Sequence, residues 1–213
     1  KRRIFTGQHG TNAAVVGVDD DHSRATYEWL KDQGHANLIP IAVGQSLDCG
    51  VCVIDGVLHD RIAKTDDTVA LDGIKTLRGS HNWQNIAAAY AAARCLGLTR
   101  GQIAEALPRF PGLAHRAESL AVIAGVEYVN DSKATNAEAA ARALATFDDI
   151  YWIAGGRAKE GGYAALDPYL KHIRHAYLIG EAAPDLADAL AGKIETTRSD
   201  TLGSAVAAAT QAA

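Results

Sequence analysis

The chain alternates between short apolar runs and polar segments, and from Val126 onward the alternation follows a strand–helix rhythm. Apolar, β-branched runs predict strands and alanine-rich runs predict helices. The strands expected here are 126–129, 149–154, 175–179 and 194–197, and the helices are 137–145, 166–170, 184–190 and 202–212. Because regular alternation of this kind is typical of a parallel, doubly wound sheet, we expect an α/β domain in this half.

The pattern of apolar and polar residues in the N-terminal half predicts a mixture of strands and helices. Its expected strands are 12–18, 36–43 and 69–77, and its expected helices are 22–31, 86–96 and 99–110. Asp55-Gly56 lies between two apolar runs within 50–58, which predicts a β-hairpin. Pro111-Gly112 then interrupts the pattern. We therefore expect one α/β domain at 1–112 and a second at 113–213.

The composition is that of an ordinary packed protein. With a net charge of -4 and a pI near 6.1, the chain has no basic footprint for nucleic acid or an anionic membrane. The sequence shows neither a signal peptide nor an 18-residue apolar run, so we expect a cytoplasmic protein. Cys49 and Cys52 have CxxC spacing, but no second Cys/His pair has zinc spacing. We expect these thiols and Cys95 to be reduced and buried.

The most polar turn of the chain lies between the strand ending at Val129 and the helix beginning at Ala137. Its polar residues are Asp131, Ser132, Lys133, Thr135 and Asn136. In open α/β sheets ligands bind beyond the carboxyl ends of strands, and a helix N-terminus favours anions. Five polar groups exceed what one helix cap requires. The residue types leave a ligand site and a well-capped polar loop equally open.

A second polar group opens the helix expected at 86–96. It consists of His81, Asn82 and Asn85, of which the two asparagines lie three residues apart on one helical face. Ser80 or Asn82 could simply cap the helix. A ligand or interdomain role and plain capping therefore both remain open here.

An acidic run, Asp19-Asp20-Asp21, precedes His22 at the end of the first predicted strand. Such a run could suggest a divalent metal site. Adjacent strand residues point to opposite faces, however, so the three carboxylates cannot all converge. We expect a solvated turn in which Asp20 or Asp21 caps the following helix.

Two cationic segments could bind an anion. His115-Arg116 follows the expected domain boundary, and a guanidinium suits bidentate contact with phosphate; an exposed ion pair with Glu118 is the alternative.

The second cationic segment is glycine-rich: residues 155–162 contain four glycines around Arg157 and Lys159. Such a loop can bring backbone and Lys159 close to an anion, with an ordinary surface loop as the alternative. It is not a Walker A loop, because the GxxxxGK motif is missing from the chain.

Four of these segments, in this order and spacing, resemble the Mur ligases. They are GSHNWQN (79–85), FPGLAHRAE (110–118), NDSKATN (130–136) and IAGGRAKEGG (153–162). The NDSKATN segment is the most specific, because it is similar to the branch of the family that adds D-glutamate. The resemblance covers essentially the whole chain. It implies the later part of a central ATP-binding domain at 1–112 and most of a Rossmann-like C-terminal domain at 113–213.

The resemblance implies an ATP-dependent ligase of peptidoglycan precursor synthesis that uses Mg²⁺ and acts as a monomer. Its substrates would be UDP-N-acetylmuramoyl-L-alanine and D-glutamate, joined through an acyl phosphate. By match to the family, Asn85 would contact the adenine, Arg116 the ATP phosphates and Asp131 the ribose hydroxyls. Lys133, Thr135 and Lys159 would contact D-glutamate. His115 and Ser132 would support these residues. Arg157 stands where the family often has an acid.

Lys1-Arg2-Arg3-Ile4-Phe5 fits the register of a lysine that the family carbamylates. The resemblance then implies that Lys1 is a catalytic group whose carbamate lies near Mg²⁺. An ordinary lysine at this position is the alternative.

The resemblance also implies that a phosphate-binding loop, a nucleotide-sugar domain and a last D-glutamate-binding segment lie outside this sequence. We therefore expect a piece of a longer enzyme that is inactive alone. Two other hypotheses stay open. One is a related ATP-dependent amino acid ligase, either another Mur ligase or a folylpolyglutamate-synthetase-like enzyme. The other is a non-catalytic nucleotide-binding α/β module.

Overall fold

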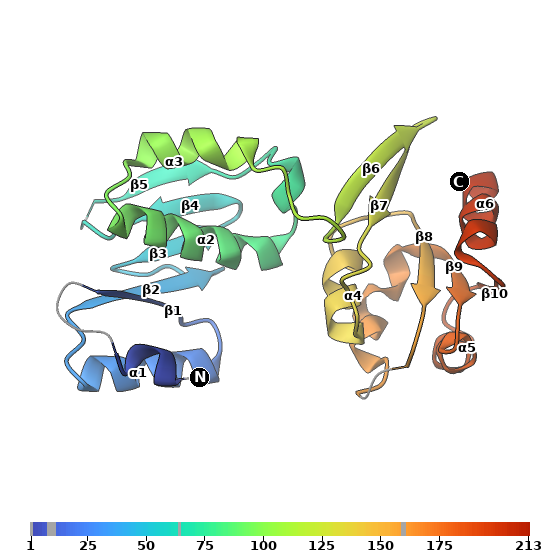
Figure 1. The fold of residues 1–213 in the computed structure, drawn as a ribbon, viewed down its shortest axis with the longest axis horizontal. Helices are drawn as coiled ribbons and strands as arrows, with labels where there is room; N and C mark the ends of the chain where they lie inside the picture. Colours follow the sequence, from blue (N-terminus) through green and yellow to red (C-terminus); the bar gives the residue numbers. More distant parts are fainter. Residues whose placement is uncertain (1, 8–11, 64, 159–160) are drawn as a thin grey trace. The chain divides into compact units, whose positions relative to one another are not determined.

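The structure is a computed structural model, and it describes all residues of the chain except 1, 8–11, 64 and 159–160 (Figure 1). The chain folds as two compact units, Lys1–Pro111 and Gly112–Ala213. This division falls one residue before the boundary expected from sequence. Each unit is described by itself below.

The N-terminal unit is built on one five-stranded sheet in the order β1-β2-β3-β4-β5. The first three strands are parallel, and β3, β4 and β5 are antiparallel. Its strands are β1 (Ala13–Gly17), β2 (Asn37–Val43), β3 (Val51–Ile54), β4 (Val57–Asp60) and β5 (Asp67–Ala70). Its helices are α1 (Asp21–Asp32), α2 (Ser80–Cys95) and α3 (Arg100–Ala106), with short 3-10 segments η1 (Arg2–Phe5), η2 (Lys75–Leu77) and η3 (Leu107–Arg109).

The alternation of side chains along β1 explains why helices cover both faces of this sheet. Ala14 and Val16 pack with Leu30 of α1. The intervening residue Val15 packs instead against the cluster that includes Tyr90 of α2. The alternating pattern of the strand thus places the N-terminal unit in three layers, helix, sheet and helix.

In the N-terminal unit, three element boundaries differ from the sequence expectation by more than two residues. Helix α2 begins at Ser80, so His81 and Asn82 lie inside its first turn. Strand β5 ends at Ala70, and the rest of the expected strand is a loop and η2. Helix α3 ends at Ala106, because Pro108 in the next turn has no N–H to continue the helical bonds. The expected hairpin at 50–58 is confirmed as β3 and β4, which pair antiparallel across Asp55-Gly56.

The C-terminal unit contains a three-stranded parallel sheet in the order β10-β9-β8 and a separate hairpin of β6 and β7. The strands are β6 (Glu118–Ile123), β7 (Val126–Asn130), β8 (Ile150–Gly155), β9 (Ile173–Ile179) and β10 (Thr196–Arg198). The helices are α4 (Ala137–Leu144), α5 (Ala183–Leu190) and α6 (Leu202–Ala212), with the 3-10 segment η4 (Ala164–His172).

Both faces of the parallel sheet are covered. On one face Leu178 packs in a cluster with Leu144 of α4, Leu166 of η4 and Leu186 of α5. On the other face Tyr177 packs with Ala205 and Ala209 of α6. A parallel α/β domain was expected, and the fold confirms it.

The expectation that the strand at 126–129 begins the parallel sheet was wrong. In the described residues β7 pairs only with β6, and the parallel sheet begins with β8. The turn between β6 and β7 is the two-residue Ala124-Gly125, with φ of 51° and 87°. Positive φ at both turn residues matches the twist of two antiparallel strands, so the local hairpin forms. The segment expected as a helix at 166–170 is likewise part of η4, which contains Pro168.

The three cysteines are free, but only Cys52 is buried, whereas Cys49 and Cys95 are exposed. The expectation of buried thiols was therefore correct for Cys52 alone. Partial desolvation still raises the pKa of the Cys95 thiol. As for membranes, the described helices include none with the length and apolar character needed to cross a bilayer.

Candidate functional site

The chain around His115-Arg116 has a strained backbone. His115 and Ala117 have φ of 65° and 45°, which is uncommon for residues other than glycine and costs free energy. Hydrogen bonds hold this conformation: the His115 N–H donates to Glu118 Oε2 at 2.8 Å. The Ala117 N–H donates to Asp131 Oδ1 at 3.0 Å. Such strain is characteristic of functional sites.

The polar turn that follows β7 is folded by its own hydrogen bonds. Asn130 Oδ1 accepts a bond from the Ser132 N–H at 3.1 Å, and the Asp131 carbonyl accepts one from the Ala134 N–H at 2.8 Å. Asn136 is the N-cap of α4, accepting from the Ala139 N–H at 2.8 Å. Both Thr135 and Asn136 are residue types that can cap a helix, and the structure uses Asn136. Thr135 is therefore left with an exposed hydroxyl.

These two segments are joined directly to each other. The Lys133 N–H donates to the His115 carbonyl at 3.0 Å, and Asn130 Nδ2 lies 2.8 Å from His115 Nδ1. Six of the residues expected at the site are thereby gathered in one region: His115, Arg116, Asp131, Ser132, Lys133 and Thr135. The side chains of Arg116 and Lys133 are exposed, and that of Asp131 is half-buried. The region therefore presents two cations and one acceptor to a ligand.

The polar residues of the N-terminal unit occupy the start of α2. Asn82 Nδ2 donates to the Arg78 carbonyl at 2.7 Å and lies 3.2 Å from His81 Nε2. Asn85 lies one turn further along α2, with Nδ2 3.4 Å from Asn82 Oδ1, and is exposed. The Asn82 side chain is thus held by hydrogen bonds at the start of α2, whereas the Asn85 amide is accessible to a ligand.

A contact that the sequence analysis missed fixes this helix start against the sheet. Gln84 Nε2 donates to Asp19 Oδ2 at 2.6 Å, and Asp19 Oδ1 accepts from the Val43 N–H at 2.9 Å. A Cβ on Gly17 would lie 3.2 Å from Gln84 Nε2, so the glycine allows this approach. Asp19 thus connects α2 to the carboxyl ends of β1 and β2, the edge at which α/β proteins bind ligands.

Asp20 caps α1, as expected: Oδ1 accepts from the Ser23 N–H at 2.9 Å. Hydrogen bonds from the Ser23 hydroxyl and N–H lower the pKa of Asp20. The interpretation of the acidic run as a turn with a helix cap is confirmed.

The glycine-rich segment after β8 folds tightly against the end of β9. A Cβ on Gly155 would lie 1.8 Å from the Ile179 carbonyl oxygen. The Gly156 N–H donates to that oxygen at 3.2 Å, and the Gly156 carbonyl accepts from the Ala182 N–H at 2.9 Å. Arg157 and Glu181 form an exposed ion pair with Nε and Oε2 3.9 Å apart. The predictions for Lys159, and for Lys1, lie outside the described residues.

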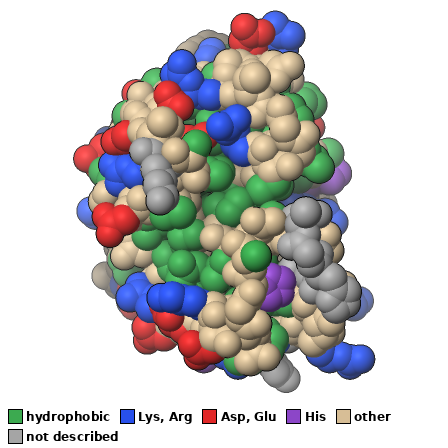
Figure 2. Space-filling view, turned by 90° about the vertical axis from the view of Figure 1, so that its left-hand side faces the viewer, with side chains coloured by type: hydrophobic (Ala, Val, Ile, Leu, Met, Phe, Trp, Pro, Cys, Tyr) green, Lys and Arg blue, Asp and Glu red, His purple; other side chains and the backbone are tan. Residues whose placement is uncertain are grey.

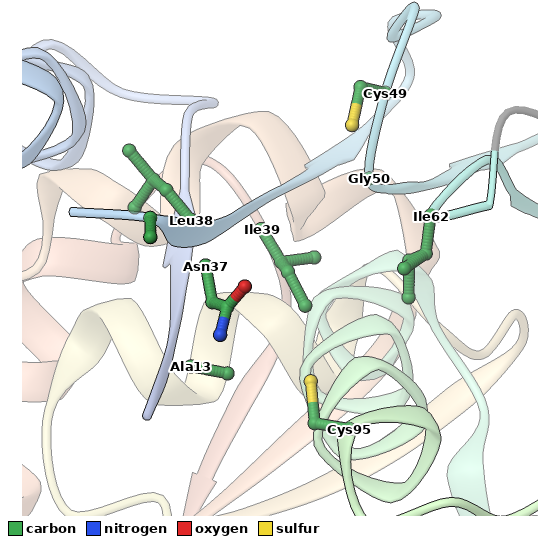
Figure 3. Close-up of a pocket in the computed structure, with 9 residues that line it drawn as sticks. Ala13, Asn37, Leu38, Ile39, Cys49, Gly50, Ile62 and Cys95 are labelled. Carbon is green, nitrogen blue, oxygen red and sulfur yellow. The ribbon is translucent and has the colours of Figure 1, made fainter. Parts of the chain in front are cut away.

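A hollow in the N-terminal unit lies away from this site. Its volume is about 400 Å³, and it lies beside Ala13 and Asn37, the first residues of β1 and β2, and Cys95, the last of α2 (Figure 3). Figure 2 shows hydrophobic side chains gathered on the face of the N-terminal unit seen from the left of Figure 1. The hollow is lined by none of the predicted site residues, and it lies at the amino ends of β1 and β2 rather than their carboxyl ends.

Comparison with known proteins gives consistent matches over nearly the whole chain. It is 48% identical over 209 residues to the UDP-N-acetylmuramoylalanine--D-glutamate ligase of Paramagnetospirillum magneticum, covering 98% of this chain and 45% of that protein. The enzyme of the same name from Rhodospirillum rubrum is 45% identical over 214 residues, covering 100% and 45%. That from Phenylobacterium zucineum is 44% identical over 207 residues, covering 97% and 44%. No protein-family model matches the chain.

Solved structures show the same fold. MurF from Acinetobacter baumannii superposes with a TM-score of 0.69 at 20% identity, covering 97% of this chain and 47% of that one. MurC from Thermotoga maritima gives a TM-score of 0.54 at 14% identity, covering 84% and 46%. The fold and the sequence matches together show that the chain belongs to the Mur ligase family. Within the family it matches the UDP-N-acetylmuramoylalanine--D-glutamate ligases, of whose length it spans about 45%. The resemblance drawn from the four sequence segments is confirmed.

Proposed function

We propose that the chain is the part of a UDP-N-acetylmuramoylalanine–D-glutamate ligase that binds ATP and D-glutamate. The observation that supports this most strongly is the 48% identity to a ligase of that name over 98% of the chain. Residues 1–112 would be the later part of the central ATP-binding domain, and 113–213 most of the Rossmann-like C-terminal domain. The ligase would act as a cytoplasmic monomer in peptidoglycan precursor synthesis, with UDP-N-acetylmuramoyl-L-alanine as its other substrate.

The contacts of the C-terminal unit support the nucleotide roles of Arg116 and Asp131. One Asp131 oxygen accepts the Ala117 N–H, which orients the carboxylate and leaves the other oxygen to accept from ribose hydroxyls. The Arg116 guanidinium is exposed and suited to a bidentate contact with phosphate oxygens. On the N-terminal unit, the exposed Asn85 amide can both donate to and accept from an adenine edge.

In the proposed D-glutamate site, lysine side chains bind the acidic amino acid. Lys133 is held through its N–H to the His115 carbonyl, and its ammonium is exposed. Lys159 would bind a carboxylate of D-glutamate, and the Thr135 hydroxyl would contact the same substrate. His115 and Ser132 would support these residues. Preorganised cations stabilise negative charge that develops during acyl and phosphoryl transfer.

The described residues do not by themselves form a magnesium site. They contain no group of three or more His, Cys, Asp or Glu side chains placed to hold a metal ion. A carbamate on Lys1 would supply a hard oxygen ligand of the kind that Mg²⁺ prefers. An extra mass of one CO₂ on Lys1 under native conditions would support this; its absence at high bicarbonate would contradict it.

The test of the function replaces the two proposed substrate-binding lysines in a full-length ligase that carries this segment. Lys133→Ala and Lys159→Ala should each lower turnover by about 100-fold or more, because each removes a positive charge from the reacting anions, while ADP still binds. Lys171→Ala, an exposed lysine of η4, is the matched control and should leave turnover unchanged. Normal turnover in both site variants would overturn the assignment.

The acceptor amino acid separates the remaining hypotheses. D-glutamate should support ADP release in the presence of the muramoyl substrate, and L-glutamate should not compete with it. Preference for L-glutamate would favour a folylpolyglutamate-synthetase-like enzyme. Nucleotide binding without turnover for any acceptor would favour a non-catalytic module.

A further inference from the structure

The side-chain amide of Asn130 has its orientation fixed by two partners. Its Oδ1 accepts a bond from the Ser132 N–H at 3.1 Å, and its Nδ2 lies 3.4 Å from Glu118 Oε2. A backbone N–H can only donate, and an ionised carboxylate can only accept. Turning the amide over would therefore break both contacts at once. The donor end of Asn130 must point toward Glu118.

The same donor end also determines the protonation of His115. Asn130 Nδ2 lies 2.8 Å from His115 Nδ1. Because an amide NH₂ group only donates, Nδ1 must be the acceptor and carry no proton. The neutral ring then has its proton on Nε2, and the ring is half exposed, with 53% of the side chain accessible.

We propose that Asn130 and Glu118 are positioning residues that hold His115 as the neutral Nε2–H tautomer and keep its strained backbone in place. The Glu118 carboxylate accepts the His115 N–H at 2.8 Å, at the residue whose φ is 65°. The His115 carbonyl in turn accepts the Lys133 N–H at 3.0 Å. One amide and one carboxylate thus connect the end of β7 and the start of β6 to the backbone of Ser132 and His115, and the His115 carbonyl connects to Lys133.

The charged groups near the ring are consistent with this arrangement. Glu118 Oε2 lies 3.9 Å from His115 Nδ1, and the nearby segments carry Arg116, Asp131 and Lys133. The Asp131 carboxylate is engaged by the Ala117 N–H. The Glu118 carboxylate would favour a proton on Nδ1, whereas the Asn130 NH₂ group opposes one. The identity of residue 130 therefore decides which nitrogen of the neutral His115 ring carries the proton. The effect of Asn130 and Glu118 on catalysis rests on the proposed function, but the His115 tautomer does not.

The direct test is ¹⁵N NMR of the histidine rings in a full-length ligase that carries this segment, with the His115 signal assigned as the one lost in His115→Gln. In the neutral ring, His115 Nδ1 should give the signal of an unprotonated nitrogen. Asn130→Asp places a carboxylate oxygen, which can only accept, against Nδ1, so a proton on Nδ1 is favoured. The His115 Nδ1 signal should then become that of a protonated ring nitrogen. Asn12→Asp, at an exposed asparagine, should leave it unchanged.

A second variant keeps the test decisive if Asn130→Asp does not fold. Glu118→Gln retains an oxygen for the His115 N–H but removes the negative charge near Nδ1, so Nδ1 should keep the signal of an unprotonated nitrogen. A proton on Nδ1 of the neutral wild-type ring would overturn the proposal. So would an Nδ1 signal that Asn130→Asp leaves unchanged, or one that Glu118→Gln changes.

Kinetics in the full-length ligase distinguish positioning from general stabilisation. Asn130→Asp should lower kcat/KM by about 10-fold near pH 7, and the loss should vary with pH, because the new carboxylate favours a proton on Nδ1. A purely structural role predicts a loss that is the same at every pH. If the ligase function itself is wrong, the wild type shows no D-glutamate-dependent turnover while the NMR result is unaffected. The two failures are therefore separable.

Discussion

Tyr90 donates a 2.9 Å hydrogen bond to Oδ2 of Asp60, and the two residues are 0% and 1% exposed. The same carboxylate oxygen accepts from Arg94 Nε at 2.8 Å, and Oδ1 accepts from the Ile62 N–H at 3.0 Å. Burial and the bond to Asp60 raise the pKa of Tyr90, and the same carboxylate raises the pKa of Arg94. One buried anion thereby joins β4 to the last two turns of α2.

Removing this carboxylate should strongly destabilise the N-terminal unit. Asp60→Ala leaves the Tyr90 hydroxyl and the Arg94 guanidinium without their acceptor, which costs about 3–5 kcal/mol for a broken buried pair. Tyr90→Phe removes only one neutral donor and should cost about 1 kcal/mol. Urea unfolding, followed through the transition of this unit, measures both free energies.

The control for this prediction is Asp32→Ala, at an exposed carboxylate in the last turn of α1. It should change the free energy of unfolding by less than about 0.5 kcal/mol. A cost for Asp60→Ala no greater than that of the control would show that water replaces the carboxylate freely.

The cap of α1 should make a small part of the stability pH-dependent. Hydrogen bonds from Ser23 lower the folded-state pKa of Asp20 below the usual value of 3.8. A carboxyl with a lowered folded pKa stabilises the fold above its unfolded pKa, and this contribution is lost as the pH falls through the folded pKa. Asp20→Asn keeps a capping oxygen that does not titrate. The free energies of unfolding of the two proteins should therefore converge in acid, and a constant difference between pH 2 and pH 6 would contradict the prediction.

Features that depend on residues close together in the sequence, such as helix caps and tight turns, were the easiest to predict. Asp20 caps α1 as expected, and Thr99 and Asn136 are also of the residue types that favour caps, because a cap bonds backbone groups only two or three residues away. The hairpin at Asp55-Gly56 follows from the same kind of local chemistry. The site segments were found through their similarity to a family, and residue types alone had left capping equally open for two of them.

Contacts between distant residues could not be foreseen in the same way. The bond from Gln84 to Asp19 joins residues 65 positions apart, and that from Arg94 to Asp60 joins residues 34 apart. Neither residue type nor periodicity specifies a partner at such separations. The antiparallel pairing of β7 with β6, in place of a position in the parallel sheet, was also missed, since an apolar strand pattern does not say whether its neighbour is parallel or antiparallel.

The close approach of the last residues of β8 and β9 should make Gly155 irreplaceable. A Cβ there would lie 1.8 Å from the Ile179 carbonyl oxygen, and φ is 150°. Because one or the other backbone must move, Gly155→Ala should cost about 3 kcal/mol or more in the transition of the C-terminal unit. Gly192→Ala is the matched control: its φ is 71°, but nothing lies within 4 Å of the added Cβ, so only the conformational cost of about 1 kcal/mol is expected. Equal costs for the two variants, measured by denaturant unfolding, would show that steric contact with Ile179 contributes nothing beyond backbone strain.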